Sequence, residues 1–153
     1  MKNSNKIKTI VKDLAEEFSK DFSTAIPFKL LPNGSLLYKN YLVKHTDNKY
    51  WGIFDVTDQR LVHEFFLKTC ALLAAKEYND LKFNQYFHIK NLDRRYQAYH
   101  NDIIVYKNNI KNITDHERHE IMQNKLQESQ IRASSYRHQI SNLFKVAFCI
   151  NTI

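Results

Sequence analysis

The chain has 153 residues, of which 43% are hydrophobic and 25% are charged, and its formal net charge is +7. This length and balance match one globular domain and exclude a disordered chain. No apolar run approaches the roughly 20 residues that span a bilayer. Residues 1–12 lack the apolar core and small-residue cleavage site of a signal peptide. We therefore expect one cytoplasmic domain over residues 1–153, with no membrane association.

The first predicted element is an amphipathic helix from about Ser4 to Phe22. Its apolar residues recur at spacings of three and four, which places them on one helical face. These residues are Ile7, Ile10, Val11, Leu14, Phe18 and Phe22. Pro27 prevents the helix from continuing further.

Residues 28–56 change to the pattern of strands and turns, and we predict a three-stranded antiparallel meander there. The first turn is predicted at Pro32-Asn33-Gly34-Ser35, the second strand at Leu36 to Lys44, the second turn at Thr46-Asp47-Asn48 and the third strand at Lys49 to Val56. Trp51, the only tryptophan, is expected to anchor this sheet to a helix.

A second helix is predicted from a cap at Thr57 or Asp58 to about Tyr78. Its segment from Leu61 to Ala75 is apolar on nearly all sides, which is typical of a helix buried at the centre of a fold. Cys70 lies in that segment, and Cys149 also has apolar neighbours. We therefore expect both cysteines to be reduced, buried packing residues.

The remaining residues form two heptad runs, each with apolar or small residues alternately three and four positions apart. The first run is Ile89, Leu92, Tyr96, Tyr99, Ile103, Tyr106, Ile110 and Ile113, and the second is Met122, Leu126, Ser129, Ala133, Tyr136, Ile140, Leu143 and Ala147. Between them, Thr114-Asp115-His116-Glu117 has the form of a capping box that begins a new helix. The pattern predicts a long antiparallel helical hairpin, part of which projects from the body. Its seam could close within the hairpin or pair with another copy.

Positive charge is concentrated in residues 81–113, which hold six Lys or Arg and two acidic residues. In residues 114–153 the acidic side chains all precede Ser129. We therefore expect a basic end of the hairpin near the body and a more acidic tip. Such a patch could contact nucleic-acid phosphates or an acidic protein. The candidate contact residues are Lys90, Arg94, Arg95, Arg132 and Arg137.

The best candidate for a metal site is a group of three side chains, His116, His119 and Glu120, that could share one helical face. The alternative is an exposed first helical turn, where acidic residues also suit the helix dipole, and we favour this alternative. Only Gly34 and Gly52 occur, which argues against glycine-rich phosphate loops. We predict no catalytic residue, no bound metal and no cofactor.

Several segments of the first half resemble small uncharacterised proteins of T4-like marine phages. They are Ile26-Pro27-Phe28-Lys29-Leu30-Leu31-Pro32-Asn33-Gly34, Tyr38-Lys39-Asn40-Tyr41, Tyr50-Trp51-Gly52 and Phe66-Leu67-Lys68-Thr69-Cys70-Ala71-Leu72-Leu73. The resemblance implies a context, a phage particle or its assembly, which would place the chain in the host cytoplasm or the virion. It assigns no functional residue.

Together these patterns predict an α+β fold, with a helix–sheet–helix body over residues 1–80 and the hairpin over residues 81–153. We favour the role of a non-enzymatic structural or assembly protein, plausibly a phage virion component. It would act through protein–protein contacts or self-association. The alternative is a nucleic-acid-associated protein that uses the basic residues of the hairpin.

Overall fold

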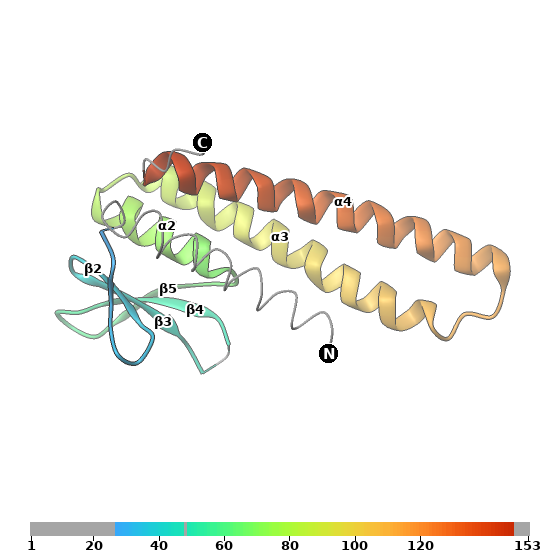
Figure 1. Ribbon diagram of the computed structural model, residues 1–153, viewed down its shortest axis with the longest axis horizontal. Coiled ribbons are helices and arrows are strands. Elements are labelled where there is room, and N and C mark those ends of the chain that lie inside the picture. The colour runs from blue at the N-terminus through green and yellow to red at the C-terminus, as the bar shows by residue number, and fades with distance from the viewer. Residues whose placement is uncertain (1–26, 48, 149–153) are drawn as a thin grey trace.

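The structure is a computed structural model that describes residues 27–47 and 49–148 (Figure 1). Within those residues the fold is mixed α+β, as predicted, with a five-stranded antiparallel sheet and three helices. All three helices lie on one side of the sheet (Figure 1). The amphipathic helix predicted for residues 4–22 lies outside the described residues.

The sheet is a meander in which each strand pairs antiparallel with the next one along the chain. Its strands are β1 (Lys29–Leu30), β2 (Leu36–Tyr38), β3 (Tyr41–His45), β4 (Trp51–Asp55) and β5 (Leu61–Phe65). The prediction of three strands was therefore wrong, and two separate errors account for the difference.

The first error concerns residues 36–44, which form a tight hairpin instead of one strand. Tyr38 pairs with Tyr41, so Lys39 and Asn40 make the turn between β2 and β3. Lys39 has a φ of 50°, in the left-handed region that side chains other than those of Gly, Asn and Asp seldom adopt. No glycine marks this turn in the sequence, which is why the pattern appeared continuous.

The second error concerns the start of the central helix. Thr57 and Asp58 do not cap a helix but belong to a turn, in which the Asp55 carboxylate accepts from the Thr57 N–H at 2.9 Å. The Asp58 carboxylate accepts from the Arg60 N–H at 3.0 Å, and Gln59 has a φ of 57°. The chain therefore reverses, and the apolar residues that follow form the edge strand β5.

Helix α2 (Lys68–Asn79) is the buried central helix that the sequence predicts. Its residues 70–75 are all buried, against the inner face of the sheet on one side and the hairpin on the other. Trp51 is half-buried against this core, and the Lys68 ammonium of α2 lies 5.0 Å from its ring centroid. Trp51 thus contacts both the sheet and the central helix.

Helices α3 (Phe83–Ile110) and α4 (His116–Ala147) form the predicted antiparallel hairpin (Figure 1). Every residue of both heptad runs is buried or half-buried, so the seam closes within the chain. The N-cap of α4 is Asp115, whose carboxylate accepts from the Glu117 N–H at 3.0 Å. The predicted capping box on Thr114 was wrong by one residue, because Asp115 supplies the acceptor instead.

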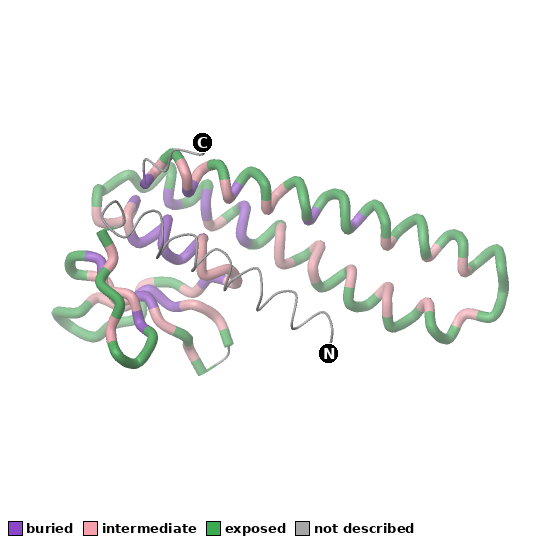
Figure 2. The backbone as a smooth tube through the Cα atoms, in the orientation of Figure 1, coloured by how far each residue is buried: buried purple, intermediate pink, exposed green. Residues whose placement is uncertain are grey.

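The two helices have 28 and 32 residues, which correspond to lengths of about 42 and 48 Å. Fully buried residues of α3 end at Asp93, and those of α4 begin at Ser129 (Figure 2). Beyond these points the helices bury only their shared seam. The distal half of the hairpin therefore projects from the body, as predicted.

Asp93 of α3 fastens the hairpin to the junction between β5 and α2. Its two carboxylate oxygens accept from the backbone N–H groups of Phe66 and Leu67, at 2.8 and 2.9 Å. Leu67 is the N-cap of α2 and its own side chain provides no cap. Asp93 therefore supplies from a distant helix the acceptor that helix starts normally receive locally, and its charge suits the helix dipole there.

Two further side chains on the same stripe of α3 also contact the body. The Lys90 ammonium donates to the Glu64 carbonyl and lies 4.3 Å from the Phe65 ring centroid. The Gln97 amide donates to the Tyr50 hydroxyl at 2.8 Å. Lys90 thus occupies the free edge of β5, an edge that would otherwise be open to pairing with another strand.

Asp93 is only 2% exposed, and burial raises the pKa of its carboxyl above the ordinary value. The two backbone N–H groups, the Lys90 charge and the Cys70 thiol, which donates to the carboxylate, all oppose that rise. Burial therefore outweighs the stabilisation that these donors give to the charged form.

We predict that Asp93→Asn lowers the free energy of unfolding by about 1–3 kcal/mol, because an amide offers one acceptor where two N–H donors converge. Urea denaturation followed by circular dichroism measures the change. The matched control is Asp102→Asn, an exposed position on the same helix, which should stay within about 0.5 kcal/mol of the wild type. Equal effects of the two substitutions would contradict the role given to Asp93.

The raised pKa of Asp93 also predicts a pH dependence. The folded state binds the proton more tightly than the unfolded state, so ionisation of Asp93 reduces stability as pH rises through the raised pKa. The difference in unfolding free energy between wild type and Asp93→Asn should therefore shift in favour of the wild type as pH falls from neutral. It should level off below the unfolded pKa of about 3.9. A shift in the opposite direction would show that the donors outweigh burial.

Candidate functional site

The outer face of the sheet, opposite the helices, carries a row of apolar side chains. Leu37, Leu42, Phe54 and Leu61 pair in that order across strands β2 to β5. None of the four belongs to the core, which takes the alternate residues of these strands, among them Val43, Ile53 and Phe65. We call these four residues the outer sheet face.

Gly52 lies at the centre of this surface. A Cβ atom at Gly52 would lie 2.8 Å from side-chain atoms of Phe54 and Thr46 and 2.9 Å from one of Leu61. The side chains around Gly52 therefore close over its backbone and form one continuous cluster. The Lys44 ammonium lies 4.5 Å from the Phe54 ring centroid, in the geometry of a cation–π contact.

An antiparallel sheet with helices on one face normally presents polar side chains on the other. The outer sheet face differs, because Leu61 is 41% exposed and the other three residues are half-buried, and no helix of residues 27–148 lies above them. A contiguous apolar surface of this kind is typical of a site that binds another protein. The sequence does contain the signal, since Leu36-Leu37 and Tyr41-Leu42-Val43 are apolar on both faces of their strands.

A second exposed apolar group lies where α2 passes into α3. Leu81 is 72% exposed, Phe83 is 44% exposed and Phe87 is 61% exposed. Phe83 and Phe87 each make a ring contact within the fold, Phe83 with Tyr78 at 5.7 Å and Phe87 with Tyr86 at 5.6 Å. We assign no partner to this group.

The predicted basic residues separate into groups on different sides of the hairpin. Lys90 and Arg94 lie beside His63 of β5, where their charges add to burial in lowering the pKa of that imidazole. Arg137 is half-buried near Tyr96, whose pKa burial raises and the Arg137 charge lowers. Lys90 is engaged with the β5 edge through the Glu64 carbonyl.

Arg95 and Arg132 come together on the other edge of the hairpin seam. Arg95 donates to the Tyr136 hydroxyl at 3.3 Å, and the Arg132 guanidinium lies 5.9 Å from the ring centroid of Tyr99. The two tyrosine rings stack at 5.8 Å. Arg132 also pairs with Glu128 at 3.1 Å. Nucleic-acid binding by these residues stays a prediction.

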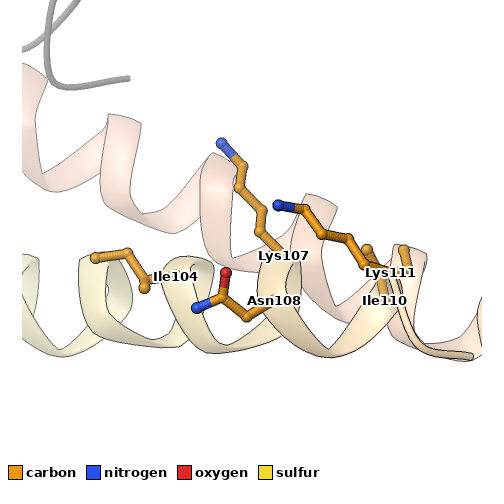
Figure 3. Close-up of a pocket in the computed structure, with 5 residues that line it drawn as sticks. All are labelled: Ile104, Lys107, Asn108, Ile110 and Lys111. Atoms are coloured by element: carbon orange, nitrogen blue, oxygen red, sulfur yellow. The ribbon is translucent and has the colours of Figure 1, made fainter. Parts of the chain in front are cut away.

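Lys107 and Lys111 lie at the end of α3 (Figure 3), near the first turn of α4 with its acidic residues. The expectation of a more acidic tip stays a prediction. With Ile104, Asn108 and Ile110 the two lysines line a shallow hollow of about 350 Å³.

A second hollow, of about 470 Å³, lies on α4. It is lined by Asn124, Gln127, Glu128, Ile131 and Arg132. Each hollow is lined by residues of a single helix, so neither brings together side chains from different elements. Both are surface depressions between neighbouring side chains of a helix.

The candidate metal group lies at the exposed start of α4. His116 and Glu120 are exposed and His119 is half-buried. Across residues 27–47 and 49–148, no three His, Cys, Asp or Glu side chains are arranged to hold a metal ion.

No family profile, curated protein or solved structure matches the chain. None of the helices in the described residues has both the length and the apolar character needed to cross a membrane.

Cys70 is fully buried, as predicted, while Cys149 lies outside the described residues. Burial, followed by the neighbouring Asp93 carboxylate, raises the pKa of the Cys70 thiol well above its ordinary value. A thiol in this environment is a poor nucleophile, because the thiolate is the reactive form. Cys70 is therefore part of the core and of the Asp93 contact.

We predict that Cys70 reacts with a disulfide reagent such as DTNB at least about 100-fold more slowly in the native chain than in urea, since reaction requires local opening of the core. A Cys149→Ser variant isolates the Cys70 signal, and absorbance at neutral pH follows the reaction. Fast native labelling of that variant would contradict the buried, inert thiol.

Proposed function

We propose that this chain is a non-enzymatic structural or assembly protein that binds another protein through the outer sheet face. The observation that carries the proposal is the apolar row of Leu37, Leu42, Phe54 and Leu61 on a sheet face that no helix of the described chain covers. Burial of such a row against a complementary surface is favourable by about 25 cal/mol per Å² of apolar area.

The arrangement of the polar groups supports a role in binding over one in catalysis. The reactive groups Asp93, Lys90 and Cys70 are all engaged in holding the hairpin to the body. The projecting hairpin adds a rigid arm that carries side chains well beyond the sheet. A compact binding face with an arm is an architecture suited to assembly.

The resemblance of the first half to small phage proteins supports a phage particle or its assembly as the context. The matching segments include Tyr38-Lys39-Asn40-Tyr41, which forms the β2–β3 turn, and Tyr50-Trp51-Gly52, which enters β4. Both segments belong to the sheet that presents the proposed binding face.

We expect a photo-reactive amino acid that replaces Leu61 to form a covalent adduct with a protein when the native cells are irradiated, because Leu61 is the most exposed member of the outer sheet face. Mass spectrometry identifies the adduct. The matched control is the same replacement of Ile131, an exposed aliphatic residue on α4 that is 63% exposed. Ile131 should give no adduct with the same protein.

The proposal fails if the probe at position 61 forms no protein adduct, or if positions 61 and 131 give the same set of adducts. Circular dichroism spectra of both labelled chains should match the wild type, which confirms that neither replacement has disturbed the fold.

A further inference from the structure

We infer that the protein that occupies the outer sheet face is a second copy of this chain, packed face to face about a two-fold axis parallel to β4. The inference rests on the proposed function, because it names the partner of the same surface. It comes from the distribution of charge and apolar side chains on either side of that axis.

Lys44 and Glu64 lie in one row across the sheet, with Gly52 between them. Lys44 of β3 pairs with Gly52 of β4, and Gly52 pairs with Glu64 of β5. Neighbouring strands are about 4.8 Å apart, so the two opposite charges lie at equal distances from the centre of the row. All three residues belong to the same outer face as Leu42 and Phe54, because side chains alternate between the two faces along a strand.

A two-fold axis parallel to β4 places β3 of one copy over β5 of the other. Lys44 then faces Glu64 of the second copy, and the same contact occurs twice because the interface is isologous. In the next row, Leu42 faces Leu61 and Phe54 faces its own counterpart. The surface of β3 to β5 is therefore complementary to itself in both charge and polarity, while Leu37 of β2 lies outside the overlap.

The Lys44 ammonium lies over the Phe54 ring and the Glu64 carboxylate is near Lys90, but within the described residues neither charge is held in an ion pair with another side chain. At the centre, the side chains of Phe54, Thr46 and Leu61 close over Gly52, and two packed sheets lie about 10 Å apart. Complementary charges on either side of an apolar centre fix the register of such an interface.

The interface is small. The three strands that overlap, β3 to β5, at a spacing of about 4.8 Å and about five residues at a rise of about 3.4 Å, cover about 250 Å² per copy. Contacts of this size are typical of weak or transient complexes. We therefore expect a monomer–dimer equilibrium with a Kd of about 10 μM to 1 mM.

Sedimentation equilibrium of the full chain at concentrations up to about 1 mM tests the inference. We expect Lys44→Glu and Glu64→Lys, each alone, to raise the Kd at least about tenfold, because each places like charges opposite one another twice. The double variant Lys44→Glu/Glu64→Lys should restore self-association. An equal mixture of the two single variants should form a heterodimer, since the acidic groups of one face the basic groups of the other.

Two further variants test whether the effect is specific to the outer sheet face and is not caused by unfolding. Leu61→Asp should also raise the Kd at least about tenfold, whereas Ile131→Asp, an equivalent change of an exposed aliphatic residue on α4, should leave it unchanged. Thermal unfolding of each variant shows whether the fold is intact. If Glu64→Lys disturbs the neighbouring Lys90, the comparison of Leu61→Asp with Ile131→Asp decides the question.

A wild-type chain that stays monomeric over the whole concentration range would overturn the inference. So would single charge variants that associate like the wild type, or a mixture of the two that does not associate. A monomeric wild type whose position 61 cross-links to a different protein would leave the proposed function standing and remove only the second copy as the partner.

Discussion

The fold depends on the contact between the Asp93 carboxylate and the backbone N–H groups that precede α2. Without it, the half-buried N–H groups of Phe66 and Leu67 would lose these acceptors, and Leu67 offers no side-chain cap in their place. The same contact fixes how α3 crosses the end of the sheet, and Lys90 and Gln97 extend it along one stripe of the helix. The hairpin, the central helix and the edge of the sheet thus share one point of attachment.

The sequence predicted those parts of the fold that repeat with a regular period. Both heptad runs, and the nearly all-apolar segment that became α2, are long enough for periodicity to identify them. The strands of the sheet were harder to predict from the sequence. They are short, and in two of the turns between them Lys39 and Gln59, not glycine, adopt positive φ. Strand β5 was predicted as part of the central helix. Its apolar residues run almost directly into those of α2, so the two elements look like one longer apolar helix in the sequence.

The candidate site was less predictable than the fold. Lys90 was predicted to be a surface contact residue and Asp93 was not singled out, and only the three-dimensional contacts show that both hold the hairpin to the body. The outer sheet face depends on which strand neighbours which, so the pairing of Leu42, Phe54 and Leu61 could not be derived while β5 was assigned to a helix. The consecutive apolar residues at 36–37 and 41–43 were the available evidence, and they become informative only once the helices are known to cover one face alone.

The hairpin is anchored near one end, and this makes it a lever. Helix α3 continues for 17 residues beyond Asp93, about 25 Å. A rotation of about 10° at the anchor would therefore move its far end by about 4 Å, close to the rise of one helical turn. The hydrogen bonds at Lys90, Asp93 and Gln97, together with the core packing at the base of the hairpin, set how accurately the tip is positioned in space, although none of those residues lies near it.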